Sequence, residues 1–142
     1  MIIDTTYILP LAGIGVKADL LRAAAEGSAW VSLDGLKLSM ISLFELQAKA
    51  AKLGIPPERV SQAVRVILRS FGVVPFYRGD VVKYAHDLKS LLRDYVDCIV
   101  VATAAALGED LVTEDRDIHA AKKSIENHYG IGVLSYWDLV RD

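Results

Sequence analysis

The chain has little cysteine, little proline and no long apolar run, and each shortage excludes a class of protein. Cys98 is the only cysteine among 142 residues, so an internal disulfide is impossible and a reducing cytoplasm is the expected location. Four prolines and ten glycines are too few for a low-complexity linker. The apolar stretches end well before the roughly 18 residues that a membrane span needs, and nothing resembles a signal peptide. We therefore expect no membrane segment.

The chain also lacks an excess of charge of either sign. Its net charge is −2 and its pI is about 5.9, so no overall basic character marks it for nucleic acid. A nucleic-acid substrate would have to be held by local patches and by a metal ion. The apolar content of 53% fits a globular protein with a substantial core, and the length suits a single domain over residues 1–142.

Apolar runs and turn residues alternate along the chain in a way that predicts strands and helices in turn. Short apolar runs predict strands at 1–3, 73–76, 111–113 and 131–134. Helices are predicted over 17–26, 43–53, 57–70, 80–92, 94–107 and 115–124, with a last helical turn at 136–140. We interpret residues 29–40 as extended chain with a turn at Asp34 and Gly35. The alternation predicts an α/β fold with a mostly parallel sheet and helices on both of its faces.

Four acidic residues stand where an apolar run meets a turn or the start of a helix. They are Asp4, Glu45, Asp97 and Asp115. In an α/β protein, side chains from distant segments can converge outside the carboxyl ends of the strands. Carboxylates that converge repel one another strongly unless a hard divalent cation such as Mg²⁺ or Mn²⁺ neutralises them. The pattern therefore predicts a metal-dependent active site.

Two of these acids also fit a helix-capping pattern. Ser42 and Glu45 have the spacing of a capping box, in which the glutamate accepts a hydrogen bond from the Ser42 backbone N–H. Asp94 and Asp97 have the same spacing, and Asp94 is the better N-cap of the two. A capping role for Asp94 would leave Asp97 free for a metal ion.

The other two acids have structural explanations as well. Asp115 or Asp117 could cap the helix that follows, and Asp4 could simply end a strand in a turn. Taken one at a time, these explanations are about as good as a role in a site. All four acids together, in this order, favour a shared site over coincidence.

The histidines and the cysteine are weaker candidates for the site. His86, His119 and His128 do not pair at a spacing typical of metal ligands, and we expect His119 to face solvent. Cys98 follows Asp97 directly, but a helix turns about 100° per residue, so we expect the thiol in the core.

Four segments carry a resemblance to a known family. They are Ile-Ile-Asp-Thr-Thr at 2–6, Ser-x-x-Glu-Leu at 42–46, Asp-Cys-Ile-Val-Val-Ala-Thr-Ala at 97–104 and Leu-Val-Thr-Glu-Asp-Arg-Asp-Ile at 111–118. In this order they resemble the PIN-domain (PilT N-terminus) family and look most like its VapC-type toxin ribonucleases. The resemblance covers essentially the whole chain, and the last two segments are its most specific pieces.

The resemblance implies a three-layer α/β/α fold and a Mg²⁺- or Mn²⁺-dependent endoribonuclease that hydrolyses RNA. It implies a toxin of a type II toxin–antitoxin pair, with a small antitoxin protein and a second copy of the chain as partners. The catalytic residues carried over by position are Asp4, Glu45, Asp97 and Asp115. Of these, the metal ligands would be Asp4, Asp97 and Asp115. Supporting hydroxyl groups and an additional acid would come from Thr6, Thr113 and Asp117.

Two other functions stay open at this point. One is a PIN-like RNA-processing or non-catalytic binding module without a toxin role, in which the acids serve folding or partner contacts. The other is a phosphatase with Asp4 as its nucleophile, which is weaker because Thr6 stands where a second aspartate is expected.

Overall fold

The structure is a computed structural model that describes residues 1–141, and within them five strands form one parallel sheet. The strand order is β3-β2-β1-β4-β5. The strands are β1 (Ile2–Ile3), β2 (Lys37–Ser39), β3 (Gly72–Val74), β4 (Leu111–Val112) and β5 (Val133–Leu134). The predicted α/β fold with a parallel central sheet is confirmed, and β2 is the part of the 29–40 segment that joins the sheet.

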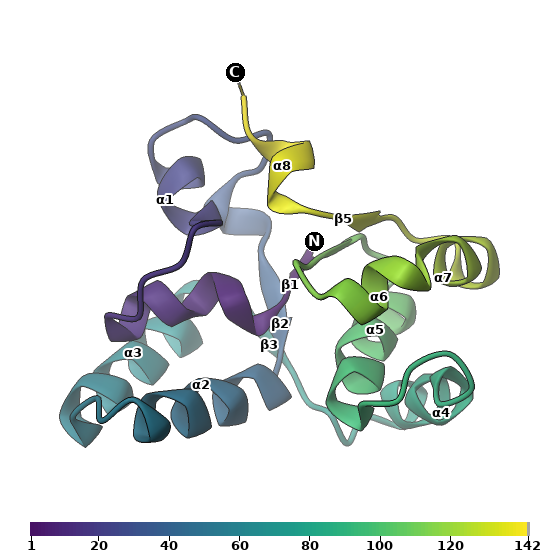
Figure 1. Cartoon of the computed structure of the whole chain (residues 1–142), viewed down its shortest axis with the longest axis horizontal. Helices are drawn as coiled ribbons and strands as arrows, with labels where there is room; N and C mark the ends of the chain where they lie inside the picture. The colour runs from purple at the N-terminus through teal and green to yellow at the C-terminus, as the bar shows by residue number, and fades with distance from the viewer. Residues whose placement is uncertain (142) are drawn as a thin grey trace.

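The connecting helices cover both faces of the sheet, with η1, α2 and α3 on one side and α4 to α7 on the other (Figure 1). The α-helices are α1 (Leu20–Ala25), α2 (Ile41–Lys52), α3 (Pro57–Ser70), α4 (Gly79–Leu88), α5 (Tyr95–Leu107), α6 (Arg116–Ala120), α7 (Lys122–Tyr129) and α8 (Tyr136–Leu139). Two 3-10 helices are η1 (Thr5–Ala12) and η2 (Leu33–Gly35). The helix predicted over 115–124 is in fact two helices, α6 and α7, which meet at Ala121.

The strands supply both halves of the core because successive side chains point to opposite faces of a sheet. Ile3 and Val112 face η1, α2 and α3. Their neighbours Ile2 and Leu111 face α4, α5 and the helices after β4. All four side chains are fully buried, so the short central strands are held on both faces. This arrangement fixes the positions of the residues that follow the strands.

Helix α5 is the central helix of the core on the face of the sheet covered by α4 to α7. It begins after Asp94, whose carboxylate accepts a hydrogen bond from the Val96 N–H at 2.8 Å, and ends at Gly108 with a φ of 62°. Both the predicted cap and the predicted core position of Cys98 are confirmed. The helix is apolar nearly all round because it is buried nearly all round. Even so, no helix within residues 1–141 is long and apolar enough to cross a membrane.

The order of the strands reverses beside β1. The chain runs from β1 to β2 and β3 at one edge, then crosses back to β4 on the other side of β1. In open α/β sheets the crevice outside the carboxyl ends of the strands at such a reversal is where ligands bind. Asp4 follows β1, and Thr113 and Asp115 follow β4, so the topology brings them to this crevice.

Candidate active site

Asp4 is held firmly at the carboxyl end of β1. One of its carboxylate oxygens accepts a hydrogen bond from the Thr113 hydroxyl at 2.7 Å, and the other accepts from the Thr5 backbone N–H at 2.7 Å. The Thr113 hydroxyl also accepts from the Asp115 N–H at 3.0 Å. Thr113 is fully buried, and its hydrogen bonds hold the residues after β1 beside the residues after β4. The structure places Thr113 beside an acidic residue, as the sequence predicted.

Asp115 is the N-cap of α6 and also faces the other acids. Its Oδ1 accepts a hydrogen bond from the Ile118 N–H at 3.0 Å, which satisfies one free donor at the start of the helix. A carboxylate has two oxygens and several lone pairs, so the cap leaves Oδ2 available for a ligand. The capping role and a role in the site are therefore compatible in this residue.

His119 does not face solvent, and that prediction is wrong. It is half-buried, and its Nε2 lies 2.7 Å from the Thr113 carbonyl oxygen. This contact ties the first turns of α6 to the end of β4. The imidazole thus helps to fix the loop that carries Asp115.

Asp97 is an acid whose ionisation is opposed by its surroundings. It lies half-buried in the first turn of α5. Burial, reinforced by the negative charges of Asp115, Asp94, Asp4 and Glu45, raises the pKa of Asp97 to about 7. A carboxyl group with this pKa is about half protonated at neutral pH. A cation placed beside it would favour the ionised form.

Three carboxylates lie close enough together to hold a metal ion. One oxygen each from Asp97, Asp115 and Asp117 all lie within 4.8 Å of one another. Oxygen ligands from carboxylates are what Mg²⁺ and Mn²⁺ prefer, and the mutual repulsion of three such groups is relieved by a divalent cation. The donor set therefore fits the predicted metal. Asp117, expected only as an additional acid, is a full member of this group.

Asp4, a metal ligand in the assignment that the resemblance implied, lies outside that group of three. Burial raises the pKa of Asp4, hydrogen bonds from Thr113 and Thr5 oppose the rise, and the charge of Asp115 adds to it. Its charge in turn raises the pKa of Asp97. The charge of Asp4 therefore acts on the acidic site. The three carboxylates that could hold one ion are those of Asp97, Asp115 and Asp117.

Glu45 reaches the site from α2. Its carboxylate accepts a hydrogen bond from the Thr5 hydroxyl, whose oxygen also lies 3.0 Å from the Ser42 hydroxyl. Helix α2 begins at Ile41 after Met40, so Ser42 is already inside the helix and the capping-box interpretation is wrong. Burial, with the charges of Asp4, Asp94 and Asp115, raises the pKa of Glu45, and the Thr5 hydrogen bond opposes this.

The threonine that contacts an acid after β1 is Thr5, whereas the resemblance pointed to Thr6. The 3-10 helix η1 starts at Thr5 and turns its hydroxyl toward α2. The only signal for this contact in the sequence is that Thr5 follows Asp4 directly.

A second contact that the sequence did not reveal lies behind Asp115. The Tyr7 hydroxyl donates a hydrogen bond to the Glu114 carboxylate, which also accepts from the Tyr136 N–H at 2.8 Å. Tyr7 is fully buried, and burial together with the neighbouring carboxylate raises its pKa. Through Glu114, η1 and the start of α8 both hold the turn that carries Asp115.

Comparisons with known proteins give one family match and several similar folds. The family model of the PIN domain matches residues 1–124. A toxin–antitoxin complex from Klebsiella pneumoniae contains a chain with a similar structure, with a TM-score of 0.60 and 23% identity over 82% of this chain and 88% of that one. FitAcB from Neisseria gonorrhoeae gives a TM-score of 0.65 at 18% identity over 96% of this chain and 97% of the other.

VapBC-5 from Mycobacterium tuberculosis, a member of the VapBC family of toxin–antitoxin systems, gives a TM-score of 0.60 at 15% identity. That match covers 94% of this chain and 96% of the other. At these identities the likeness concerns the fold. No curated protein sequence matches the chain.

Proposed function

The chain belongs to the PIN domain family, and from that premise we propose that it is a Mg²⁺- or Mn²⁺-dependent endoribonuclease. Its substrate is RNA, and residues 1–142 form one nuclease domain that acts in the cytoplasm. The observation that carries the proposal is the group of carboxylate oxygens from Asp97, Asp115 and Asp117 within 4.8 Å, with Asp4 and Glu45 close enough to raise the pKa of Asp97.

In this proposal Asp97, Asp115 and Asp117 hold the cation, and Asp4 adds negative charge behind them. When bound, Mg²⁺ or Mn²⁺ lowers the pKa of a water molecule and neutralises charge on the phosphate. Asp97 must lose its proton to act as a ligand, and a cation beside it would favour that loss by lowering its raised pKa of about 7. Thr113 orients Asp4, and Asp115 keeps one oxygen on the helix start and directs the other into the site.

Glu45 is the residue that we assign to the attacking water. Its raised pKa suits a group that accepts a proton during the reaction, because a stronger base removes a proton more readily. The Thr5 hydroxyl fixes one carboxylate oxygen, so the other is free to accept from water. No side chain needs to form a covalent bond to the substrate in this scheme.

We also propose that the chain is the toxin of a type II toxin–antitoxin pair and forms a homodimer. The similar folds of the Klebsiella toxin–antitoxin complex and the Mycobacterium VapBC protein support this role. Induced expression in a bacterial host should then arrest growth, and co-expression of a small protein encoded immediately upstream should restore it. Growth that continues during expression of the active protein would argue against the toxin role.

The nuclease proposal is tested by the substitution Asp97→Asn. We expect it to lower Mg²⁺-dependent cleavage of RNA at least about 100-fold, because the amide carries no charge for the cation. The matched control is Asp34→Asn, which removes the same charge at an exposed position in η2. The control should cleave at close to the parent rate. Unchanged cleavage by purified, folded Asp97→Asn protein would reject the proposal.

A further inference from the structure

A trough runs between α4 and α7 and leads away from the acidic site. Two cavities make it up, one of about 550 Å³ and one of about 750 Å³. The smaller one is lined by Asp117 and Arg93, and the larger one by His128 and its neighbours. Both are lined by the same three residues, Ser90, Leu91 and Ser124, so they are continuous. One end of this α4/α7 trough is therefore a carboxylate of the acidic group itself.

One wall of the trough is formed by α6 and α7. Asp117 and Ala120 of α6 line its part near the acidic group, and Ser124 and His128, four residues apart on one face of α7, line the rest. At about 1.5 Å per residue, the α7 part of this wall extends roughly 9 Å from Lys122 to His128. The trough thus continues beyond the acidic site along α7.

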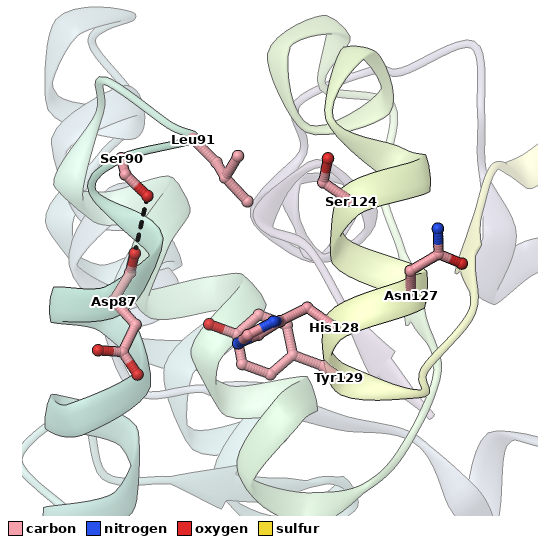
Figure 2. A pocket seen from close by; sticks show the side chains of 7 residues that line it. All are labelled: Asp87, Ser90, Leu91, Ser124, Asn127, His128 and Tyr129. Carbon is pink, nitrogen blue, oxygen red and sulfur yellow. Dashed lines mark hydrogen bonds between the residues drawn. The ribbon is translucent and has the colours of Figure 1, made fainter.

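The far end of the trough has side chains of the kinds that bind unstacked bases in RNA-binding proteins. Figure 2 shows Ser124 and His128 of α7 on one side of an open space and Leu91 on the other, while the Asn127 side chain points away from it. His128 is exposed, and its ring lies 4.7 Å from the ring of Tyr129. Aromatic and imidazole rings stack on the bases of single-stranded RNA, and hydroxyl and amide groups bond to base edges.

The charges along the trough also suit a polynucleotide. Arg93 lines the cavity next to Asp117, and among residues 1–141 no carboxylate forms an ion pair with it. Its guanidinium is therefore available for a phosphate. The carboxylate of Asp87, the acid at the other end, points away from the opening in Figure 2. Its backbone carbonyl is already taken by the Ser90 hydroxyl at 3.2 Å.

We propose that the α4/α7 trough binds the single-stranded RNA that adjoins the cleaved bond. Arg93 contacts a phosphate near the acidic site, and a base further along the strand lies against His128. This inference rests on the proposed function, because it takes the acidic group as the place where the strand is cut.

The test measures binding without cleavage. The parent for all variants carries Asp97→Asn, and the probe is a fluorescein-labelled single-stranded RNA of mixed sequence, about 10 nucleotides long, followed by fluorescence anisotropy. Ser124→Trp fills the trough and should weaken binding about tenfold, and His128→Ala should weaken it about fivefold through the loss of one stacked base. Arg93→Gln should weaken binding about threefold and reduce the slope of log K against log salt by about 0.7.

Two matched variants on α3 control for these changes. Ser70→Trp adds the same side chain, and Arg69→Gln removes the same charge, at exposed positions in the other half of the molecule (Figure 1). Both should bind the probe as the parent does. Urea unfolding of each variant shows whether it is folded, and Arg93→Gln tests the trough even if Ser124→Trp fails to fold.

The outcomes separate the two proposals. If the protein with Asp97 intact cleaves RNA but the trough variants bind the probe as tightly as the parent, the trough proposal is wrong and the nuclease proposal stands. If that protein does not cleave but the trough variants weaken binding, the trough binds single-stranded RNA, whereas the nuclease proposal and the placement of the strand beside a cleaved bond are wrong. Equal losses in the α3 controls, or no binding of RNA at all, would overturn the trough proposal.

Discussion

At the scale of single residues, two adjacent threonines after β1 have different surroundings. The Thr5 hydroxyl donates to Glu45 and touches Ser42, whereas within residues 1–141 the Thr6 hydroxyl has no hydrogen bond to another side chain. We expect Thr5→Val to lower kcat/KM for RNA about 10-fold or more, because a residue that orients an acid in a metal site has effects of this size. Thr6→Val is the matched control and should change kcat/KM little. A larger loss in Thr6→Val than in Thr5→Val would contradict this assignment.

A second residue-scale prediction concerns Asp97 and pH. Its folded pKa of about 7 lies above the ordinary value of 3.8, so ionisation opposes folding. In the metal-free protein this group is fully favourable below pH 4, and its contribution is lost as the pH rises to about 7. Asparagine does not ionise, so the Asp97→Asn protein does not lose this contribution to folding stability as the pH rises.

In EDTA at pH 8, the Asp97→Asn protein should therefore be more stable than the parent, by on the order of 2 kcal/mol after allowance for solvent screening. The advantage should shrink toward zero at pH 4. Urea unfolding at both pH values measures it, and saturating Mn²⁺ should reverse the order at pH 8, because the parent alone retains all three carboxylates. An equal difference at both pH values would show that charge on Asp97 is not the cause.

The acids could be predicted from the sequence because each stands at the end of a local element. Asp4 ends a strand, and Asp97 opens a helix, so local patterns are enough to find them. Their partners could not be predicted, because the Thr5–Glu45 contact joins residues 40 apart and the Tyr7–Glu114 contact joins residues 107 apart. Nothing in a single sequence indicates which hydroxyl groups will meet which carboxylates over such separations.

At the scale of elements, Gly13 shows how η1 is fitted against α3. Gly13 ends η1 with a φ of 84°, and a Cβ there would lie 2.8 Å from Cζ of Arg59. Gly13→Ala should lower the free energy of unfolding by about 1–2 kcal/mol, chiefly through backbone strain at this positive φ, because the flexible end of the Arg59 side chain can shift. Gly15→Ala, where a Cβ meets nothing within 4 Å, should be neutral or slightly stabilising. Thermal unfolding compares the two variants. Equal changes in stability would show that Gly13 is not required at the end of η1.

The helices and strands could be predicted where a capping residue or a glycine marks their ends. Asp94 and Gly108 bound α5, and Gly54 with a φ of 73° follows α2 near the predicted stop. Helix η1 was not predicted, because a 3-10 helix that contains Pro10 shows no apolar stripe with a period of 3.6 residues. The break between α6 and α7 at Ala121 also has no glycine or proline to mark it.

At the scale of the whole molecule, the acidic site draws on helices from both sides of the sheet. Glu45 comes from α2 on one side, and Asp97 and Asp117 come from α5 and α6 on the other. A bound cation should therefore stabilise the entire fold. At 100 times its Kd, Mn²⁺ contributes about 2.7 kcal/mol, which corresponds to a rise in Tm of about 5–10 °C.

Calorimetry in Mn²⁺ and in EDTA measures this rise. Asp97→Asn should abolish it, and Asp34→Asn, at an exposed position in η2, should keep it. A parent protein whose Tm does not respond to millimolar Mn²⁺ would favour a binding module without metal chemistry.

The central place of β1 in the sheet has a consequence for how the protein is made. Asp4 leaves the ribosome first, yet its partner Thr113 follows 109 residues later. Strand β1 cannot gain its neighbour β4 before then, and contacts between residues so far apart in the chain form slowly. A nascent or truncated chain therefore carries the first acid without the rest of its site. The chain cannot acquire its complete acidic site until translation has passed α6, so the activity proposed for that site has to wait for synthesis of this helix.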